Sequence, residues 1–420
     1  MENQRIIQVE DKVPGKLLIP LSLQHMFAMF GASVLVPFLF GINPAIVLFM
    51  NGIGTLLFIV ITKGKPPAYL GSSFAFIAPA NIVISKFGYP YALGGFVAVG
   101  FCGCLLALII KKCGTKWIDI VLPPAAMGPV VALIGLELSA TAANNAGLIG
   151  DNIQMANVWV FLITLGVAIF GNICFRKFLS VIPILIAIIC GYIAAICFGL
   201  VDFTTVANAP LFAIPNFSTP KFDINAILMI LPVLLVITSE HIGHQIVTGK
   251  IIGKNLLEDP GLHRSLFGDN FSTMISGFIG SVPTTTYGEN IGVMAITGVY
   301  SVQVIAGAAV LSIICSFVGP LSALIQTIPG PVIGGISFLL YGMIGGLRIL
   351  VDQKVDYATN KNLILTSVVF VTGLSSITLS FGGVELTGMV LACIVAMILS
   401  LTFYLLDKFN LTNDTAEENN

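Results

Sequence analysis

Mostly apolar runs of about 20 residues repeat along this chain, from residue 17 to residue 407. A run of that length, folded as a helix, crosses a hydrocarbon core of roughly 30 Å. Only 9% of the 420 residues are charged and 56% are hydrophobic, whereas soluble domains are about one quarter charged. Because such a chain cannot cover a surface that faces water, the sequence predicts an all-α integral membrane protein.

The hydropathy pattern predicts 14 transmembrane segments. Two of them, residues 68–86 and 284–297, are shorter than the others and polar at one end. The other segments are expected at residues 17–40, 44–62, 91–110, 117–139, 157–175, 179–200, 224–248, 265–280, 299–325, 329–350, 362–380 and 384–407.

The distribution of lysine and arginine predicts the orientation of these segments. Cytoplasmic loops of membrane proteins carry an excess of these two cations. If both termini are placed in the cytoplasm, the external loops hold only Lys86 and Lys221. The internal loops then hold Lys63, Lys65, Lys111, Lys112, Lys116, Arg176, Lys177, Lys250, Lys254, Arg264, Arg348, Lys354 and Lys361.

The composition argues against several kinds of partner. A net charge of −1 gives no indication of a nucleic-acid partner. Most of the eight cysteines lie inside predicted spans, which favours a small hydrophobic role over disulfide or metal chemistry. No metal site and no cofactor is expected. Residues 1–16 are polar, and the apolar run after them is too long for a cleavable signal.

The two short segments are the third and the tenth, so they hold matching places in two halves of seven segments. An odd number of crossings turns the second half upside down relative to the first. The repeat is supported by a weak similarity between PPAAMGPVVALIG (residues 123–135) and PGPVIGGISFLLYG (residues 329–342). Inverted repeats with matched broken helices indicate a secondary transporter that binds its substrate near the midplane. Chance similarity among glycine- and proline-rich segments is the alternative.

Both short segments contain residues that favour extended backbone over helix, in YLGSSFAF (residues 69–76) and TTTYGENIG (residues 284–292). Unpaired backbone inside a membrane is tolerated only where protein or a water-filled cavity satisfies it. We therefore expect the two extended pieces to pair with each other. The short helix after each would then direct its free N–H groups at a common point, where carbonyl oxygens or anions could bind.

Ionisable groups deep in a membrane are costly and are therefore functional candidates. The deep candidates include Glu240, His244 and Glu289. Glu240 and His244 are four residues apart and share a helix face, whereas His241 is rotated about 100° from Glu240 and is expected to face packing or a backbone partner. A carboxylate beside a histidine can hold or release one proton near neutral pH, which is the chemistry of proton coupling. A mutually satisfied pair that only locks helix packing is the alternative.

Other polar residues are expected to have supporting roles. Gln24 and His25 form a polar pair in the first span, from which a hydrogen-bond bridge toward the eighth span is predicted. For His25, direct contact with the ligand is the alternative. Glu137, Asp269 and Glu385 lie nearer to span ends or loops and are interpreted as interfacial carboxylates. Asp269 and Asn270 also sit in a ninth span rich in small residues, which is expected to pack tightly behind the site.

Several motifs resemble those of one transporter family. ENIGVMAITG (residues 289–298) is similar to the signature Q/E/P-N-x-G-x-x-x-x-T-G of the nucleobase–ascorbate transporters, also called the nucleobase:cation symporter-2 family. The dipeptide QH at residues 24–25 resembles the first-span motif of that family. The chain most closely resembles the uracil permease branch of that family, through the segments GSSFAFIAP (71–79), EHIGH (240–244), DPGLHRS (259–265) and TTYGENIGVMAIT (285–297).

The resemblance implies a fold of 14 spans in two inverted repeats of seven, divided into a core domain and a gate domain. Residues 17–115 (spans 1–4) and 222–326 (spans 8–11) would form the core. Residues 116–205 (spans 5–7) and 327–407 (spans 12–14) would form the gate. Residues 1–16 and 408–420 would be cytoplasmic tails.

The resemblance also implies a role for individual residues. Glu240 and Glu289 would be the carboxylates that contact the nucleobase. His244 would orient or protonate near Glu240 in proton coupling. The remaining wall of the pocket would come from Ala32, Phe74, Tyr287, Gly288 and Tyr341. Structural support would come from Gln24, His25, Asn290 and Thr297.

The expected function is proton-coupled uptake of uracil by alternating access, in the cytoplasmic membrane of a bacterium. Uracil presents two N–H donors and two carbonyl acceptors, which two glutamates and backbone N–H groups can match. A xanthine or urate symporter of the same family is the nearest alternative. An anion exchanger or channel of the same architecture is disfavoured because two acidic residues would repel its substrate. An enzyme is not expected, since no nucleophile–base pair is visible, and the resemblance further implies a homodimer through gate spans.

Overall fold

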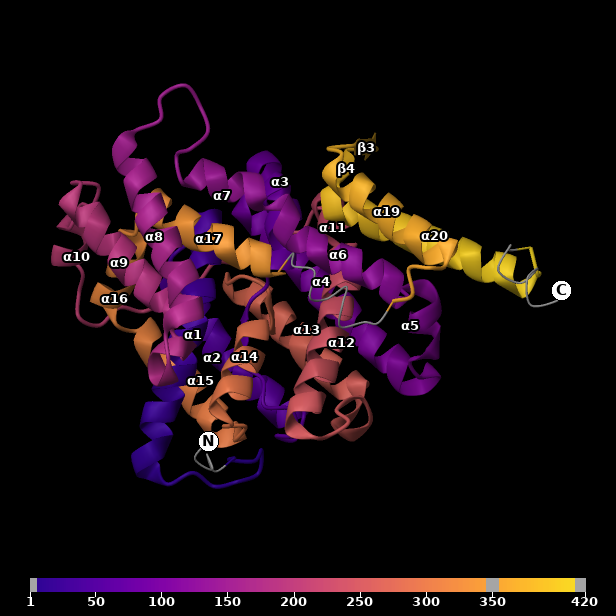
Figure 1. The fold of residues 1–420 in the computed structure, drawn as a ribbon, viewed down its shortest axis with the longest axis horizontal. Helices are drawn as coiled ribbons and strands as arrows, with labels where there is room; N and C mark the ends of the chain where they lie inside the picture. The colour runs from indigo at the N-terminus through magenta and orange to yellow at the C-terminus, as the bar shows by residue number, and fades with distance from the viewer. Residues whose placement is uncertain (1–5, 345–354, 412–420) are drawn as a thin grey trace.

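The computed structural model describes residues 6–344 and 355–411, and helices make up most of this part of the chain (Figure 1). Arg348 and Lys354, two cations of the predicted internal loops, lie outside the described residues, as do residues 1–5 and 412–420 of the predicted tails. Within the described residues the strands form two small antiparallel sheets, β1–β2 and β3–β4.

The first half of the chain contains α1 (Gly15–Phe40), α2 (Pro44–Ile61), β1 (Leu70–Ser72), η1 (Phe74–Phe76), α3 (Ile77–Phe87), α4 (Tyr89–Cys113), α5 (Lys116–Val121), α6 (Pro124–Glu137), α7 (Ser139–Asn145), α8 (Met155–Cys174), η2 (Lys177–Val181), α9 (Pro183–Cys197) and α10 (Thr204–Ala207). The second half contains α11 (Ile224–Ile230), α12 (Val233–Ile252), η3 (Leu257–Gly261), α13 (Leu262–Ile279), β2 (Thr284–Thr286), α14 (Gly288–Thr297), α15 (Val302–Ser316), α16 (Gly319–Gln326), α17 (Gly330–Ile344), α19 (Asn360–Leu374), β3 (Thr378–Phe381), β4 (Val384–Thr387) and α20 (Gly388–Lys408).

Each of the 14 predicted segments contains at least one of these helices, which confirms an all-α membrane fold. In the described part of the chain, 7 helical spans are long and apolar enough to cross a membrane, with α6 and α7 counted as one span and α11 and α12 as another. Helices α16 and α17 together would make an eighth span bent by 83°. The remaining segments are shorter or more polar. Helix α13, for example, buries Asp269, Asn270 and several serine and threonine side chains.

Prolines divide three segments that hydropathy predicts as continuous. The segment 224–248 is split at Pro232 into α11 and α12. The segment 117–139 is split at Pro123 into α5 and α6, and the segment 299–325 ends as a helix at Ser316, before Pro320 opens α16. Proline lacks the N–H that a helix interior needs and disfavours helical geometry in the residue before it, so each new helix begins within one residue of the proline.

Close contacts between helices occur at small residues. Helix α13 packs along α4, where a Cβ at Gly103 would overlap the side chain of Asn270. Helix α15 packs along α2, where a Cβ at Gly52 would meet the carbonyl of Ala309. Small residues that let helix backbones approach closely are typical of membrane helix interfaces. These contacts hold α2, α4, α13 and α15 together around the two short strands β1 and β2.

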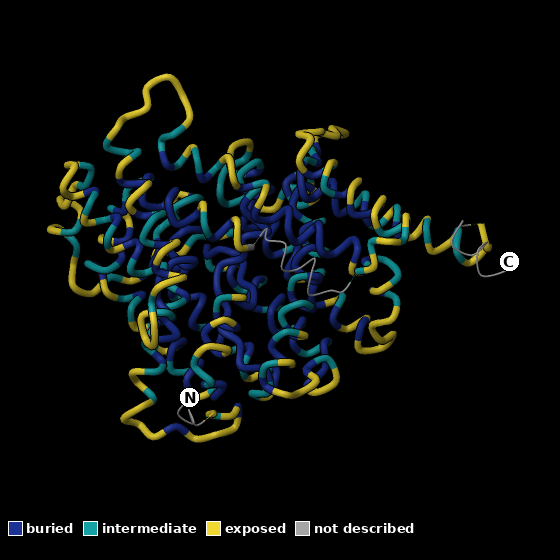
Figure 2. The backbone as a smooth tube through the Cα atoms, viewed as in Figure 1, coloured by how far each residue is buried: buried dark blue, intermediate teal, exposed yellow. Residues whose placement is uncertain are grey.

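A second group of helices packs beside the first and consists of two sets. Helices α8, α9 and α17 pack on one another on the left of Figure 1, while α6, α19 and α20 pack together and extend to its right. The interior of both groups is buried, and the exposed residues concentrate in the loops and on the outer helix faces (Figure 2). Many of the exposed residues on those outer faces are large and apolar, as expected for helices in contact with lipid.

Residues 6–13, here called the N-terminal strap, are docked on the second half of the chain. The Ile7 N–H donates to the Gly298 carbonyl (2.9 Å), and the Tyr300 N–H donates to the Ile7 carbonyl (2.8 Å). Val9 is buried in a small apolar cluster with residues of α12 and α14. This part of the predicted cytoplasmic tail is therefore integrated into the fold.

Candidate functional site

Strands β1 and β2 pair with each other in the middle of the protein, as the sequence predicts. Gly71 lies opposite Thr285 in this antiparallel pair. One further backbone hydrogen bond extends it, from the Tyr287 N–H to the Tyr69 carbonyl (3.1 Å). A short helix follows each strand directly, η1 and α3 after β1 and α14 after β2. Because the strands are antiparallel, η1 begins at one end of the pair and α14 begins at the other, so the strand pair lies between the free N–H groups of the two helix starts.

Hydroxyl groups of α13 anchor β2 in the protein interior. The Thr273 hydroxyl donates to the Thr284 carbonyl (2.7 Å) and accepts from the Thr284 N–H (3.1 Å). Ser272 and Thr284 form a further hydroxyl–hydroxyl bond of 2.7 Å. A two-stranded pair has unpaired outer edges, and buried backbone groups must find partners. The polar character of α13 is explained by this requirement.

The aromatic ring of Tyr287 lies directly against Gly71. A Cβ at Gly71 would overlap the ring and its hydroxyl oxygen, so only glycine fits at this position. Tyr287 is buried, at 3% exposure, and immediately precedes the first residue of α14. The contact therefore shapes the backbone at the break in the tenth span.

Two carboxylates and a histidine meet at the start of α14. Glu289 lies in the first turn of α14, and Glu240 and His244 lie on α12, which packs against it. The His244 Nδ1 hydrogen bonds the Thr286 hydroxyl (3.1 Å), and a Cβ at Gly288 would lie 3.4 Å from His244 Nε2. All three ionisable side chains remain partly accessible. Accepting carboxylates and donating N–H groups thus lie within one small region.

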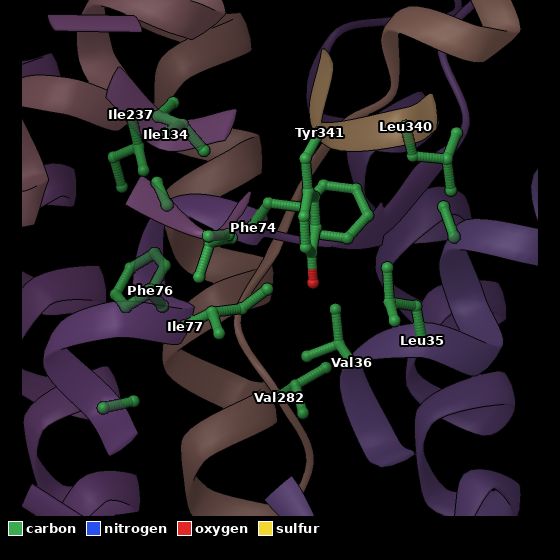
Figure 3. Packing of buried hydrophobic residues seen from close by; sticks show 14 of the residues in the cluster. Leu35, Val36, Phe74, Phe76, Ile77, Ile134, Ile237, Val282, Leu340 and Tyr341 are labelled. Atoms are coloured by element: carbon green, nitrogen blue, oxygen red, sulfur yellow. The ribbon is translucent and has the colours of Figure 1, made fainter. Parts of the chain in front are cut away.

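Phe74 and Tyr341 close the other side of this region. Their rings meet edge to face, with 6.2 Å between centroids and 82° between planes, and Figure 3 shows them side by side. Phe74 comes from η1, whereas Tyr341 comes from α17 in the second group of helices. Ala32 is buried nearby in the same apolar core. The Tyr341 hydroxyl and Glu240 Oε2 are buried here and make no hydrogen bond to any of the described residues.

Asn290 fixes the broken span from two directions. Its Nδ2 donates to the Pro67 carbonyl (3.0 Å), and its Oδ1 lies 3.2 Å from Nδ1 of His25. The predicted bridge from the first span toward the eighth is therefore wrong, because His25 reaches α14 of the tenth span. Gln24 is buried beside it on α1. Thr297, at the other end of α14, donates to the Val293 carbonyl (2.8 Å).

The sequence analysis missed a buried pair behind the site. His241 Nδ1 and Asp269 Oδ2 lie 3.0 Å apart, and the two side chains are 0% and 3% exposed. Asp269 was expected at a membrane interface and is instead buried within α13, so that expectation is wrong. His241 packs against the ring of Phe58, as expected, but its polar partner is the Asp269 side chain and not a backbone group. Asp269 lies inside α13, on the face toward α12. The polar, small-residue composition of residues 265–276 is the sequence signal that could have located it.

The other two predicted interfacial carboxylates do lie at ends of elements. Glu137 ends α6 and accepts the Met389 N–H (3.1 Å). Glu385 lies on β4 and pairs with Lys86 at 2.5 Å. In the described part of the chain, no group of three or more histidine, cysteine, aspartate or glutamate side chains could hold a metal ion.

Comparison with known proteins supplies relatives for this arrangement. The model of the family described as "Permease family" matches residues 16–382. Uracil permease of Paenibacillus larvae is 54% identical over 418 residues, covering 98% of this chain and 99% of that protein. Uracil permease of Escherichia coli (strain K12) is 54% identical over 96% of this chain and 95% of that protein. Uracil permease of Bacillus subtilis (strain 168) is 47% identical, covering 91% and 92%.

Two solved structures share the fold at low sequence identity. The transmembrane domain of a cyanobacterium bicarbonate transporter, BicA, has a TM-score of 0.67 at 15% identity, covering 94% of this chain and all of that chain. The murine Solute Carrier 26 family member A9 anion transporter, in its inward-facing state, has a TM-score of 0.72 at 10% identity, covering 95% and 69%. Both have two inverted repeats of seven spans, which confirms the predicted architecture of this chain.

Proposed function

The chain belongs to the permease family of nucleobase:cation symporter-2 transporters, and we propose that it takes up uracil across the cytoplasmic membrane in symport with protons. It is a transporter and not an enzyme. Its near full-length similarity to uracil permeases supports uracil as the substrate.

One structural observation carries this proposal: the pairing of β1 with β2 brings Glu289 and the start of α14 opposite Glu240. Uracil carries two N–H donors and two carbonyl acceptors on its edge. In the proposal the two carboxylates accept from the N–H groups, and N–H groups near Phe74, Tyr287 and Gly288 donate to the carbonyls. Phe74 covers the ring face.

A site of this kind selects its substrate through the cost of unpaired groups. A nucleobase that lacks one edge donor or acceptor would leave a buried carboxylate or N–H without a partner. Such mismatches discriminate more strongly than an extra methyl group does. Xanthine and urate present a second ring, for which Phe74 and Tyr341, packed edge to face, leave little room.

Alternating access requires two bodies that move relative to each other. We assign spans 1–4 and 8–11 to a core that carries the site, and spans 5–7 and 12–14 to a gate. The packing of α2, α4, α13 and α15 around β1 and β2 supports the first body, and the packing of α8, α9 and α17 supports the second. Tyr341 belongs to the gate, and in the proposal it closes over a uracil bound to the core.

Proton coupling is assigned to Glu240 together with His244. A carboxylate that must be neutral in one step and ionised in another can couple substrate movement to a proton gradient. Its support is the position of both side chains on one accessible face of α12, beside Glu289. With both termini in the cytoplasm of a bacterium, the protein would carry uracil into the cell together with protons that move down their gradient. The homodimer implied by the resemblance is also part of the proposal.

Uptake of radiolabelled uracil by cells that express the protein tests the function. We expect saturable uptake that unlabelled uracil inhibits, that xanthine, urate and bicarbonate do not inhibit, and that a protonophore abolishes. Uptake that ignores the protonophore and follows a sodium gradient would reject proton coupling while leaving uracil as the substrate. Competition by xanthine as strong as that by uracil would favour the purine alternative.

A further inference from the structure

The pair of His241 and Asp269 lies on the side of α12 that faces away from the proposed uracil site. The side chains of both residues are almost fully buried, and His241 Nδ1 lies 3.0 Å from Asp269 Oδ2. The Thr285 hydroxyl also contacts Asp269 Oδ2, at 3.4 Å. On its other side the His241 ring meets the ring of Phe58 edge to face, with 6.4 Å between centroids. The pair thus joins α12 and α13 to strand β2.

An ionised aspartate at this depth requires a compensating positive charge. No lysine or arginine of the described residues pairs with Asp269, and His241 is the one basic group that contacts it. An unpaired buried charge is strongly unfavourable, so His241 is the partner that can balance the charge of Asp269 and leave the pair neutral overall.

The charge of this pair acts on the proposed site. Glu240 is next to His241 on α12, and Glu289 lies on α14, which packs against α12, so the charge of the pair lies one residue away from the proposed proton-coupling group. Of the elements packed here, α2 contributes no titratable side chain and α4 contributes Cys104. Any change in the net charge of the pair therefore changes the ease with which Glu240 binds and releases a proton.

We propose that His241 is a positioning residue for proton coupling, which balances the charge of Asp269 so that Glu240 exchanges its proton within the working pH range. This inference rests on the proposed function and assigns His241 a role through Asp269, without contact to uracil. If the pair were only a structural hydrogen bond, replacing His241 by an uncharged donor would leave the proton exchange of Glu240 unchanged.

The substitution His241→Asn separates the two roles. Asparagine can donate a hydrogen bond to Asp269 but cannot carry a positive charge, so nothing would balance the negative charge of Asp269. The Glu240 proton is then held more tightly, and the midpoint of the pH profile of uracil uptake should move to higher pH by about one unit or more. Uptake into proteoliposomes, measured between about pH 5 and 9 beside uracil binding, gives this midpoint.

Two further variants control this measurement. His263→Asn makes the same change in the first turn of α13, outside the buried pair, and should leave the midpoint unchanged. The double variant His241→Asn/Asp269→Asn removes both charges and keeps an amide pair. Because the net charge is again zero, its midpoint should return to within about 0.3 unit of the wild-type value.

Several results would overturn the inference. An unshifted midpoint in His241→Asn would reduce His241 to a hydrogen-bond donor. The same shift in the single and double variants would show that charge balance is not the cause. If His241→Asn fails to fold, His241→Gln removes the same charge with a longer amide and should show the same shift, and an unshifted midpoint or failure of both to fold would assign the pair a purely structural role. A wild-type protein that takes up no uracil in these vesicles would instead reject the proposed function itself.

Discussion

At the scale of single residues, the site depends on groups that cannot be exchanged for similar ones. Gly71 must be glycine because the ring of Tyr287 occupies the space of a side chain. Glu289 must be a carboxylate if it accepts hydrogen bonds from a neutral ring. Both residues lie next to the break in a membrane span, where the backbone itself forms part of the site.

Gly71→Ala should displace the Tyr287 ring and the start of α14 behind it. Forcing a methyl group into a packed interior costs about 1–3 kcal/mol. We expect a lower thermal unfolding temperature together with weaker uracil binding, measured on the purified protein. Gly166→Ala on α8, where nothing lies within 4 Å of the added methyl group, is the matched control and should retain both properties. Equal behaviour of the two variants would contradict the proposed packing.

Glu289→Gln replaces an acceptor by a group that also donates, so one uracil N–H would face a donor. A hydrogen bond to a charged group contributes about 1.5–3 kcal/mol, so affinity for uracil should fall on the order of 10- to 100-fold. Glu258→Gln makes the same change at an exposed position of η3 and should bind normally. Calorimetric binding measures both, and affinity of Glu289→Gln within about twofold of wild type would remove Glu289 from the site.

At the scale of elements, short segments are held by distant ones. The N-terminal strap adds backbone hydrogen bonds to the residues just after α14, and Glu10 forms an ion pair with Lys254 beyond the end of α12. The hydrogen bond from Lys254 lowers the pKa of Glu10 below its usual value. The strap therefore ties together the C-terminal ends of the two helices that carry the proposed site, α12 and α14.

The strap should loosen in acid. A carboxyl whose pKa is lowered in the folded state stabilises that state at neutral pH, and this contribution is lost as pH falls through the lowered value. Exposed ion pairs contribute about 0–1 kcal/mol, so amide-exchange protection of residues 7, 300 and 302, whose N–H groups form the backbone bonds of the strap, should fall by up to about fivefold. Glu10→Gln should show the lower protection already at pH 7, with no further acid effect. Unchanged protection in that variant would show that the backbone bonds alone hold the strap.

At the scale of the whole molecule, alternating access requires contacts that form and break between core and gate. Lys86, in the last turn of α3, pairs with Glu385 on β4 at 2.5 Å, and both side chains are about one third exposed. In the proposed division Lys86 belongs to the core and Glu385 to the gate. The pair should therefore form in only one of the two access states.

Joining the two side chains covalently should stop the cycle. A water-soluble carbodiimide converts a carboxylate and an amine in contact into an amide, so it should block uracil uptake by wild type while Glu385→Gln resists. Asp407→Asn removes the carboxylate of the Lys361–Asp407 pair, which lies within the proposed gate, and should remain as sensitive as wild type. Equal inactivation of Glu385→Gln and wild type would show that this pair does not separate during transport.

Local information in the sequence was sufficient for the class of fold and for the choice of candidate site residues. Runs of apolar residues predict membrane spans because hydrocarbon excludes unpaired polar groups. Clusters of glycine, serine and threonine predict the two breaks because they disfavour helix, and Glu240 and Glu289 stand out because ionisable groups are rare at such depth. Prolines also mark where three predicted spans are divided, although averaging hydropathy over a window of residues hides these breaks.

The choice of partners was decided only by the tertiary structure. His25 bonds Asn290 across 265 positions, and His241 meets Asp269 across 28 positions. Helical periodicity predicts which face a residue occupies, but not which helix packs on that face. That choice depends on where small residues such as Gly71 and Gly103 allow close approach, which is a property of two surfaces together. For the same reason, the sequence indicated a carboxylate and a histidine for proton coupling, while only the packed helices showed a second buried pair behind them.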